Sequence, residues 1–268
     1  AIACSQYNLW SSIHDHWSFQ VSPFFLTIMP RNKKGRALDK WKSNRPATQA
    51  GCVRVIGGKF RGISLLYSGN KVTRPMKDNT REALFNLVGG YLQKTIVFDL
   101  FAGTGVIGIE AVSRGAAHAF LIERHVPTTK LIRTNVETVG VQKEVTLDSS
   151  DTFFWVRQFI KHNQHESTDA DSDHSVFQRI AGSEAPWAVF CCPPYDFFVQ
   201  RTDEIVDLLN SLLNVCPPGS LFIVESDARF DLERLPMADR WTCHEYAPAI
   251  LSVLKMAGPE TNEEDHQA

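Results

Sequence analysis

The sequence has no apolar run close to the length that a helix needs to cross a bilayer, which excludes a membrane-spanning helix. Its six cysteines form no C-x-x-C pair, and no group of cysteine and histidine has the spacing of a zinc site. Residues 1–28 lack the basic start and small-residue cleavage site of a targeting signal. We therefore expect a protein of the reduced cytoplasm, with no membrane contact, no disulfide framework and no metal.

Net charge is also nearly absent, because 28 Lys and Arg face 30 Asp and Glu. The balance is uneven along the chain. Between Arg31 and Arg81 there are 14 basic residues and only two acids, Asp39 and Asp78. This asymmetry indicates a polyanion-binding segment attached to an acidic body. A basic tail that only aids solubility is the alternative.

The first 72 residues divide into two parts. Residues 1–50 show no sustained periodicity and are basic from residue 31, so we expect a disordered or loosely held arm. The chain begins at Ala1 and not at a methionine, and one hypothesis is that the natural start is Met29. Residues 51–72 are expected to form a small β-hairpin extension, since strand-forming residues flank Gly57-Gly58.

Residues 73–257 alternate between strand and helix patterns, which predicts an α/β domain with a mostly parallel sheet. We expect strands at 96–100, 117–122, 145–147, 187–192 and 221–225, an antiparallel edge strand at 249–256, and helices at 80–92, 105–114, 127–139 and 202–213. Residues 162–185 are polar and acidic and predict a mobile insertion, and 258–268 predict a disordered tail.

A glycine loop follows the strand expected at 96–100. Gly103, Gly105 and Gly108 form the pattern G-x-G-x-x-G ahead of a helix, where backbone can approach a nucleotide-like cofactor closely. Glu123 ends the next strand, at the position that accepts hydrogen bonds from ribose hydroxyls. A solvated acid at a strand end is the alternative for Glu123. The glycine loop and Glu123 together fit either a nicotinamide cofactor or S-adenosylmethionine.

Three features favour S-adenosylmethionine. Asp99 precedes the glycines, where its carboxylate suits an ammonium group and would repel a diphosphate, although it could also cap the turn. Asp151 follows the third strand and is placed for the adenine amine; Asp148 competes for that role, and either could be a turn acid. The turn from Cys192 to Tyr195 follows the fourth strand, at the end of the sheet where ligands bind, although it could be only structural.

Several runs resemble the RsmD family, bacterial guanine-N2 methyltransferases of small-subunit ribosomal RNA. The most specific run is T-R-P-x-x-D-x-x-R-E-A-L-F-N at 73–86. The others are R-V-I-G-G-K-F-R-G at 54–62, D-L-F-A-G-T-G at 99–105 and S-R-G-A at 113–116. The resemblance covers roughly residues 53 to 256.

The resemblance implies a Rossmann-like class I methyltransferase fold, a seven-stranded sheet with an antiparallel edge strand, plus the N-terminal hairpin. It implies S-adenosylmethionine as methyl donor and the exocyclic amine of guanine as acceptor. The residues it places at the cofactor are Asp99, Phe101, Gly103, Gly105, Glu123, Arg124 and Asp151. The residues expected to contact RNA are Arg54, Lys59, Arg61, Arg74 and Arg81, of which Arg74 and Arg81 could instead border the cofactor carboxylate. The residues expected at the reaction are Cys192, Pro193, Pro194 and Tyr195.

Cys192 departs from the family pattern. Amino methyltransferases of this type have Asp or Asn there, and that side chain accepts hydrogen bonds from the target amine. A neutral thiol is a poor acceptor, and burial disfavours the thiolate. Positioning by the turn and the Pro193 carbonyl could still support slower transfer.

Three functions therefore stay open. The first is methylation of guanine N2 in ribosomal RNA by a monomer, with RNA or a small-subunit assembly particle as partner; Tyr195 would stack on a base splayed out of its helix. The second is methylation of another planar amine, on DNA adenine, DNA cytosine or protein glutamine. The third is a catalytically weakened RNA-binding relative, which Cys192 motivates.

Overall fold

A computed structural model describes residues 51–69, 75–164, 180 and 183–258, all within one compact unit, Pro46–Ala268. The expected arm, Met29, Arg74 and nearly all of the expected tail lie outside the described residues. So does most of the expected insertion at 162–185. At its start, residues 162–164 continue a helix, and Ile180 is buried in the core.

The main sheet has seven strands in the order β5-β4-β3-β6-β7-β9-β8. They are β3 (Ile96–Asp99), β4 (His118–Ile122), β5 (Val145–Asp148), β6 (Trp187–Cys191), β7 (Leu221–Asp227), β8 (Thr242–Tyr246) and β9 (Ala249–Lys255). The first five strands in that order are parallel, and β9 is antiparallel to both β7 and β8. The predicted Rossmann-like methyltransferase architecture is confirmed.

One detail of the predicted sheet is wrong. The strand expected at the edge, β9, lies inside the sheet between β7 and β8. The antiparallel strand at this edge is β8, which the sequence did not predict. Its side chains are exposed or only partly buried, so they lack the apolar alternation that marks a strand with one buried face.

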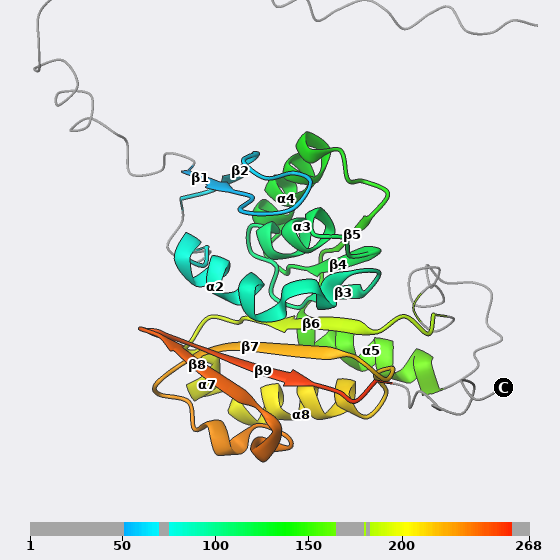
Figure 1. Cartoon of the computed structure of the whole chain (residues 1–268), viewed down its shortest axis with the longest axis vertical. Coiled ribbons are helices and arrows are strands. Elements are labelled where there is room, and N and C mark those ends of the chain that lie inside the picture. Colours follow the sequence, from blue (N-terminus) through cyan, green and yellow to red (C-terminus); the bar gives the residue numbers. More distant parts are fainter. Residues whose placement is uncertain (1–50, 70–74, 165–179, 181–182, 259–268) are drawn as a thin grey trace, which may run out of the picture. The chain divides into compact units, whose positions relative to one another are not determined.

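Helices cover both faces of the sheet (Figure 1). One face carries α2 (Asp78–Val88), α3 (Val106–Ser113) and α4 (Val126–Val139), and the other carries α5 (Thr152–Gln164), α7 (Phe197–Gln200) and α8 (Thr202–Leu213). Short 3-10 turns lie at η2 (Gly89–Leu92), η3 (Leu232–Arg234) and η4 (Ala238–Arg240). Buried apolar side chains form two cores, a first core under α2, α3 and α4 and a second core under α5, α7 and α8. The helix α5 was not predicted; its aromatic side chains, including Phe153 and Phe159, pack in the second core. None of the helices within the described ranges has the length and apolarity to cross a membrane.

The N-terminal extension is a hairpin of β1 (Gly51–Arg54) and β2 (Ser64–Tyr67). The predicted turn at Gly57-Gly58 is wrong, because a longer connection, 55–63, joins the strands. These glycines instead allow close contact with the end of α3. Gly58 has φ +76°, and a Cβ there would lie 2.1 Å from the Ser113 carbonyl oxygen. The N–H of Lys59 donates to that carbonyl at 2.7 Å.

Asn135 on α4 joins the hairpin to the rest of the domain. Its side chain is 1% exposed. Its amide oxygen accepts from the N–H of Leu66 at 2.7 Å, and its amide nitrogen donates to the carbonyls of Leu66 at 2.9 Å and Thr104 at 3.2 Å. A single amide therefore ties β2 to the glycine loop.

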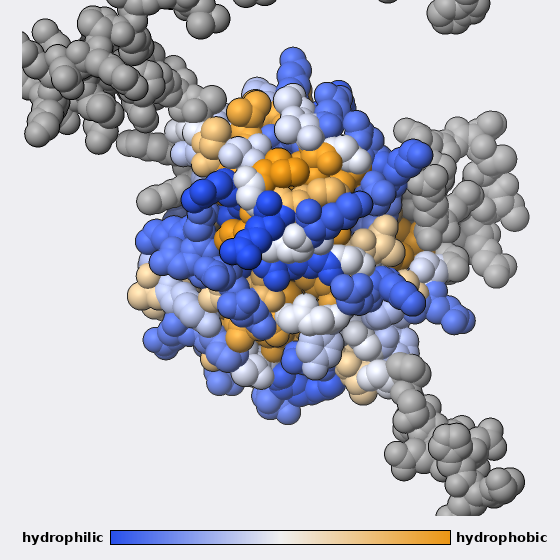
Figure 2. All heavy atoms as spheres, turned by 45° about the horizontal axis from the view of Figure 1, so that its top comes forward, coloured by the Kyte–Doolittle hydropathy of each residue, from blue (hydrophilic) through white to orange (hydrophobic). Residues whose placement is uncertain are grey.

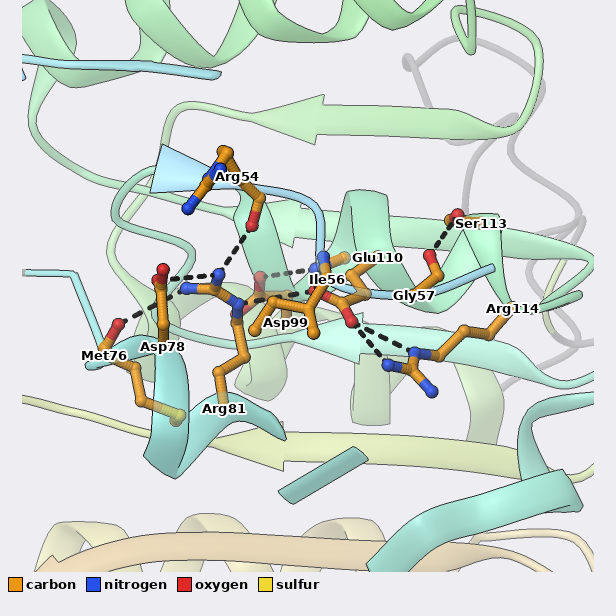
Figure 3. A network of polar contacts seen from close by, with 11 residues as sticks. Arg54, Ile56, Gly57, Met76, Asp78, Arg81, Asp99, Glu110, Ser113 and Arg114 are labelled. Carbon is orange, nitrogen blue, oxygen red and sulfur yellow. Dashed lines mark hydrogen bonds and ion pairs between the residues drawn. The ribbon is translucent and has the colours of Figure 1, made fainter. Parts of the chain in front are cut away.

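A buried ion pair joins α2 to α3 (Figure 3). The side chains of Arg81 and Glu110 are both fully buried, with Nε and Oε2 3.4 Å apart. Arg81 also donates to the Arg54 carbonyl at 2.6 Å and to Asp78 at 3.0 Å. Glu110 accepts from the Ile56 N–H at 3.1 Å. The expectation that Arg81 contacts RNA or the cofactor is therefore wrong for this conformation, because its donors are used inside the protein.

We expect Arg81→Ala to lower the free energy of unfolding by about 3 kcal/mol, because it removes one of two cationic partners of a buried carboxylate and the donor to the Arg54 carbonyl. The other cation, Arg114, donates to Oε1 of Glu110 at 2.7 and 3.1 Å and remains in the variant. Urea denaturation followed by circular dichroism measures this change. The matched control is Arg133→Ala on the exposed side of α4, which should cost less than about 0.5 kcal/mol. Similar losses in the two variants would contradict the structural role of Arg81.

Candidate functional site

The site lies at the carboxyl ends of β3, β4, β5, β6 and β7, where open α/β sheets bind ligands. The strand β3 ends at Asp99, and the following loop turns through Gly103 and Gly105, both with positive φ, of +53° and +74°. A Cβ on Gly105 would lie 2.9 Å from Ile132, whereas a Cβ on Gly103 would meet nothing nearer than 3.9 Å. The loop is thus packed on its inner side at Gly105 and open at Gly103.

Asp99 carries a carboxylate oxygen that has no partner. The side chain is fully buried; Oδ2 accepts from the N–H of Gly108 at 3.1 Å, and Oδ1 has no hydrogen-bond partner. Burial raises the pKa of Asp99 to about 7; the Gly108 N–H lowers it and the charge of Glu123 raises it. A buried acceptor without a donor favours a ligand that brings one, and a cationic ammonium group satisfies this need.

Glu123 holds the glycine loop from the end of β4. Its Oε2 accepts from the N–H of Gly103 at 2.9 Å, and its Oε1 accepts from the N–H of His125 at 2.8 Å. The carboxylate is therefore fixed in direction by two backbone donors. It keeps further lone pairs that can accept hydrogen bonds from a diol.

Asp151 lies where α5 begins. Its Oδ1 accepts from the N–H groups of Phe153 and Phe154, and its Oδ2 lies 3.7 Å from the guanidinium of Arg124. This is the geometry of a helix cap, which agrees with the alternative that Asp151 is a turn acid. Its role toward adenine stays a prediction. Only Oδ1 takes part in the cap. Oδ2 faces the exposed guanidinium of Arg124 and can still accept a hydrogen bond from a ligand.

An aromatic cluster that the sequence did not predict adjoins Asp151. The ring of Phe101 packs edge-on against Phe153 at 6.0 Å and Phe197 at 6.1 Å between centroids. The guanidinium of Arg201 lies 3.9 Å from the Phe153 centroid, and that of Arg124 lies 5.7 Å from the Phe197 centroid. Apolar rings at this edge can pack against a planar heterocycle. Only Phe101 and Arg124 were predicted. Phe153 and Phe197 lie on α5 and α7, two helices that the sequence did not predict, and Arg201 lies between α7 and α8.

The Cys192–Tyr195 turn follows β6 directly. Cys192 is partly exposed, Pro193 is buried and Pro194 is exposed. The hydroxyl of Tyr195 donates to Oε1 of Glu225 on β7 at 2.7 Å. Burial, then the charges of Glu225 and Asp99, raise the pKa of Cys192 well above its ordinary value, so the thiol is neutral at physiological pH.

Glu225 is the residue near this turn that sequence reasoning missed. It is only 8% exposed, and burial raises its pKa. Its position at the end of an apolar strand was the signal that could have found it, because acids are rarely buried without a partner. Within the described residues, no group of three or more His, Cys, Asp and Glu is placed to hold a metal ion.

The residues predicted to contact RNA do not share one environment. Arg54, Lys59 and Arg61 are exposed on the hairpin and its connection. Figure 2 shows that hydrophilic side chains cover much of this side of the molecule, around smaller hydrophobic patches. Arg81 is buried, as described above, and Arg74 lies outside the described residues.

Comparisons with known proteins agree with this architecture. The model of a family described as Conserved hypothetical protein 95 matches residues 53–245. YlbH of Bacillus subtilis is 35% identical over 181 residues, which are 67% of this chain and 85% of YlbH. Ribosomal RNA small subunit methyltransferase D of Escherichia coli is 33% identical over 114 residues, and the chain spans 58% of that relative.

A solved structure shows the same fold. The yhhF structure from Escherichia coli superposes with a TM-score of 0.56 at 23% identity, covering 77% of this chain and 99% of that one. The family match, the relatives and the fold agree. The chain belongs to the RsmD family of S-adenosylmethionine-dependent methyltransferases.

Proposed function

We propose that this protein transfers the methyl group of S-adenosylmethionine to the exocyclic N2 amine of a guanine in small-subunit ribosomal RNA. The observation that carries the proposal is the Pro193-Pro194-Tyr195 turn, which stands at the same sheet edge as the unpartnered oxygen of Asp99. The name of the Escherichia coli relative, a ribosomal RNA small subunit methyltransferase, supports the choice of substrate. We place the reaction in the cytoplasm, with a monomer acting on RNA or on an assembling particle.

The cofactor residues take distinct roles in this proposal. Asp99 accepts from the ammonium group, Gly103 and Gly105 allow the methionine end to approach the backbone, and Glu123 accepts from the ribose. Asp151 accepts from the adenine amine, and Phe101 and Arg124 lie beside the adenine. The bound cofactor supplies an electrophilic methyl group on a sulfonium, so no metal is required for the transfer.

The hairpin supplies the RNA contacts. The cations of Arg54, Lys59 and Arg61 attract phosphates from solvent-exposed positions. Tyr195 stacks on the target base, and the rigid turn presents the Pro193 carbonyl to its amine. The neutral thiol of Cys192 favours a second candidate, an RNA-binding protein with weakened catalysis, and transfer experiments separate the two.

The direct test is incubation of the protein with labelled S-adenosylmethionine and immature small ribosomal subunits. We expect label in the RNA, recovered as N2-methylguanosine after digestion to nucleosides. Label in another nucleoside would show that this nucleoside, and not guanosine, is the substrate. An unlabelled RNA, with S-adenosylhomocysteine binding shown by calorimetry, would favour the second candidate.

Cofactor affinity should depend on pH through Asp99. The ammonium group binds the ionised carboxylate, and the raised pKa of about 7 means that the carboxylate loses its charge below neutrality. The affinity for S-adenosylhomocysteine should therefore fall by about tenfold between pH 8 and pH 6. Calorimetry measures this change. Asp99→Asn should weaken binding and remove the pH dependence, whereas Asp207→Asn, on the exposed side of α8, should preserve both.

The hairpin cations should account for part of the salt dependence of RNA binding. Replacing Arg54, Lys59 and Arg61 together by Ala should weaken RNA binding and reduce the slope of log K against log salt by about 2, since each phosphate contact contributes about 0.7–0.9. Fluorescence anisotropy with labelled ribosomal RNA fragments measures the slope. An unchanged slope would remove the hairpin from the RNA interface.

A further inference from the structure

We propose that Glu225 accepts the hydrogen bond of the target amine, and then its proton, in place of the Asp or Asn whose position Cys192 occupies. This inference rests on the proposed function and deepens it. It adds a catalytic residue on β7 to the turn that follows β6.

Strand register places the two residues together. Cys191, the last residue of β6, pairs with Val224 on the parallel strand β7. Cys192, which follows β6 directly, therefore stands opposite Glu225, the next residue of β7. Side chains that stand opposite in a parallel pair share a face of the sheet, and neighbouring strands lie about 4.8 Å apart. A carboxylate on Glu225 therefore reaches the region in front of Cys192.

Asp99 belongs to the same face of the sheet. Val97, two residues earlier on β3, belongs to the first core with Ala188 and Ile223, and side chains alternate along each strand. The negative charges of Asp99 and Glu225 both act on the Cys192 thiol. The ammonium partner proposed for Asp99 and the acceptor proposed on Glu225 thus lie on either side of the same thiol.

The hydrogen bonds of Glu225 leave room for an amine. Tyr195 donates to Oε1 at 2.7 Å, which fixes the direction of the carboxylate. Among the described residues, Oε2 accepts no hydrogen bond, and no Lys, Arg or His pairs with Glu225. An acid that is only 8% exposed and has one uncommitted oxygen favours a ligand with an N–H donor.

The reaction balances with Glu225 as the proton acceptor. The lone pair of the guanine N2 forms the new bond to the methyl carbon, and the bond between that carbon and sulfur breaks with its electron pair remaining on sulfur. The nitrogen then carries one proton too many and releases it to Oε2 of Glu225. Burial raises the pKa of Glu225, which makes the carboxylate more ready to take the proton.

The competing role is structural: Glu225 could act only by orienting Tyr195. Three variants separate the roles, Glu225→Gln, Tyr195→Phe and Cys192→Asn. In Glu225→Gln the Tyr195 hydroxyl can keep its bond to the amide oxygen, so the amide nitrogen faces the amine and cannot accept from it. Asn is preferred to Asp at position 192 because Asp would add a third carboxylate beside Asp99 and Glu225.

The first experiment needs no turnover. Guanosine monophosphate, or inosine monophosphate, which lacks the exocyclic amine, is titrated into protein saturated with S-adenosylhomocysteine. NMR measures the affinity for each nucleotide. We expect the wild type to bind the guanine nucleotide about tenfold more tightly, Glu225→Gln to lose this preference, and Tyr195→Phe to retain it. Equal affinity of the wild type for both nucleotides, including no detectable binding of either, would overturn the proposal.

The second experiment is a double-mutant cycle on methyl transfer. Glu225→Gln should lower kcat by 10- to 100-fold in the wild-type background and by less than threefold in the Cys192→Asn background, where an amide oxygen can accept instead. Equal losses in the two backgrounds, or a loss in Tyr195→Phe as large as that in Glu225→Gln, would assign Glu225 a structural role.

Two controls distinguish a failure of this role of Glu225 from a failure of the proposed function. Glu137→Gln, an exposed acid on α4, should change neither measurement, and each variant should retain the wild-type affinity for S-adenosylhomocysteine. A wild type that labels no RNA would refute the proposed function, whereas the comparison of the two nucleotides would still decide whether Glu225 binds the amine.

Discussion

The buried pair of Arg81 and Glu110 is the interaction on which the N-terminal half of the domain depends. Arg81 belongs to α2, Glu110 to α3, and both also bond to the backbone of the hairpin and its connection, at Arg54 and Ile56. Three separate segments therefore converge on two charges. Since α3 begins immediately after Gly105, the same pair fixes the helix that closes the glycine loop.

The carboxyl edge of the sheet combines rigidity with unmet hydrogen-bonding capacity. Glu123, Asp151 and Asp99 are each directed by backbone N–H groups. Asp99 and Glu225 each keep one oxygen without a partner among the described residues. Directed acids hold their positions before a ligand arrives, and unpartnered acids favour its binding. The neutral thiol of Cys192 lies between these two acids. Acceptance of hydrogen bonds from a ligand at this site therefore depends on Asp99 and Glu225 and not on Cys192.

The sequence predicted the parallel strands and the glycine loop because long apolar runs and glycines carry strong local signals. It did not predict β8, whose side chains are not alternately buried, or the role of Gly57-Gly58, which depends on contact with Ser113 more than fifty residues later. Arg81 was misread for the same reason. A run of basic residues does not reveal which of its members is buried against Glu110, because that partner lies on another helix.

The hairpin docks through contacts of very different sequence separation. Its own strands pair residues no farther apart than Gly51 and Tyr67, whereas its bonds to Glu110, Ser113 and Asn135 span more than fifty positions. Short loops close at low entropic cost, and distant contacts form only after both partners are ordered. The hairpin can therefore close early in folding, but it docks only once α3 and α4 exist. The hairpin and the seven-stranded sheet are separate hydrogen-bonded units, so loss of these docking contacts would release the hairpin and leave the strand pairing of the main sheet intact.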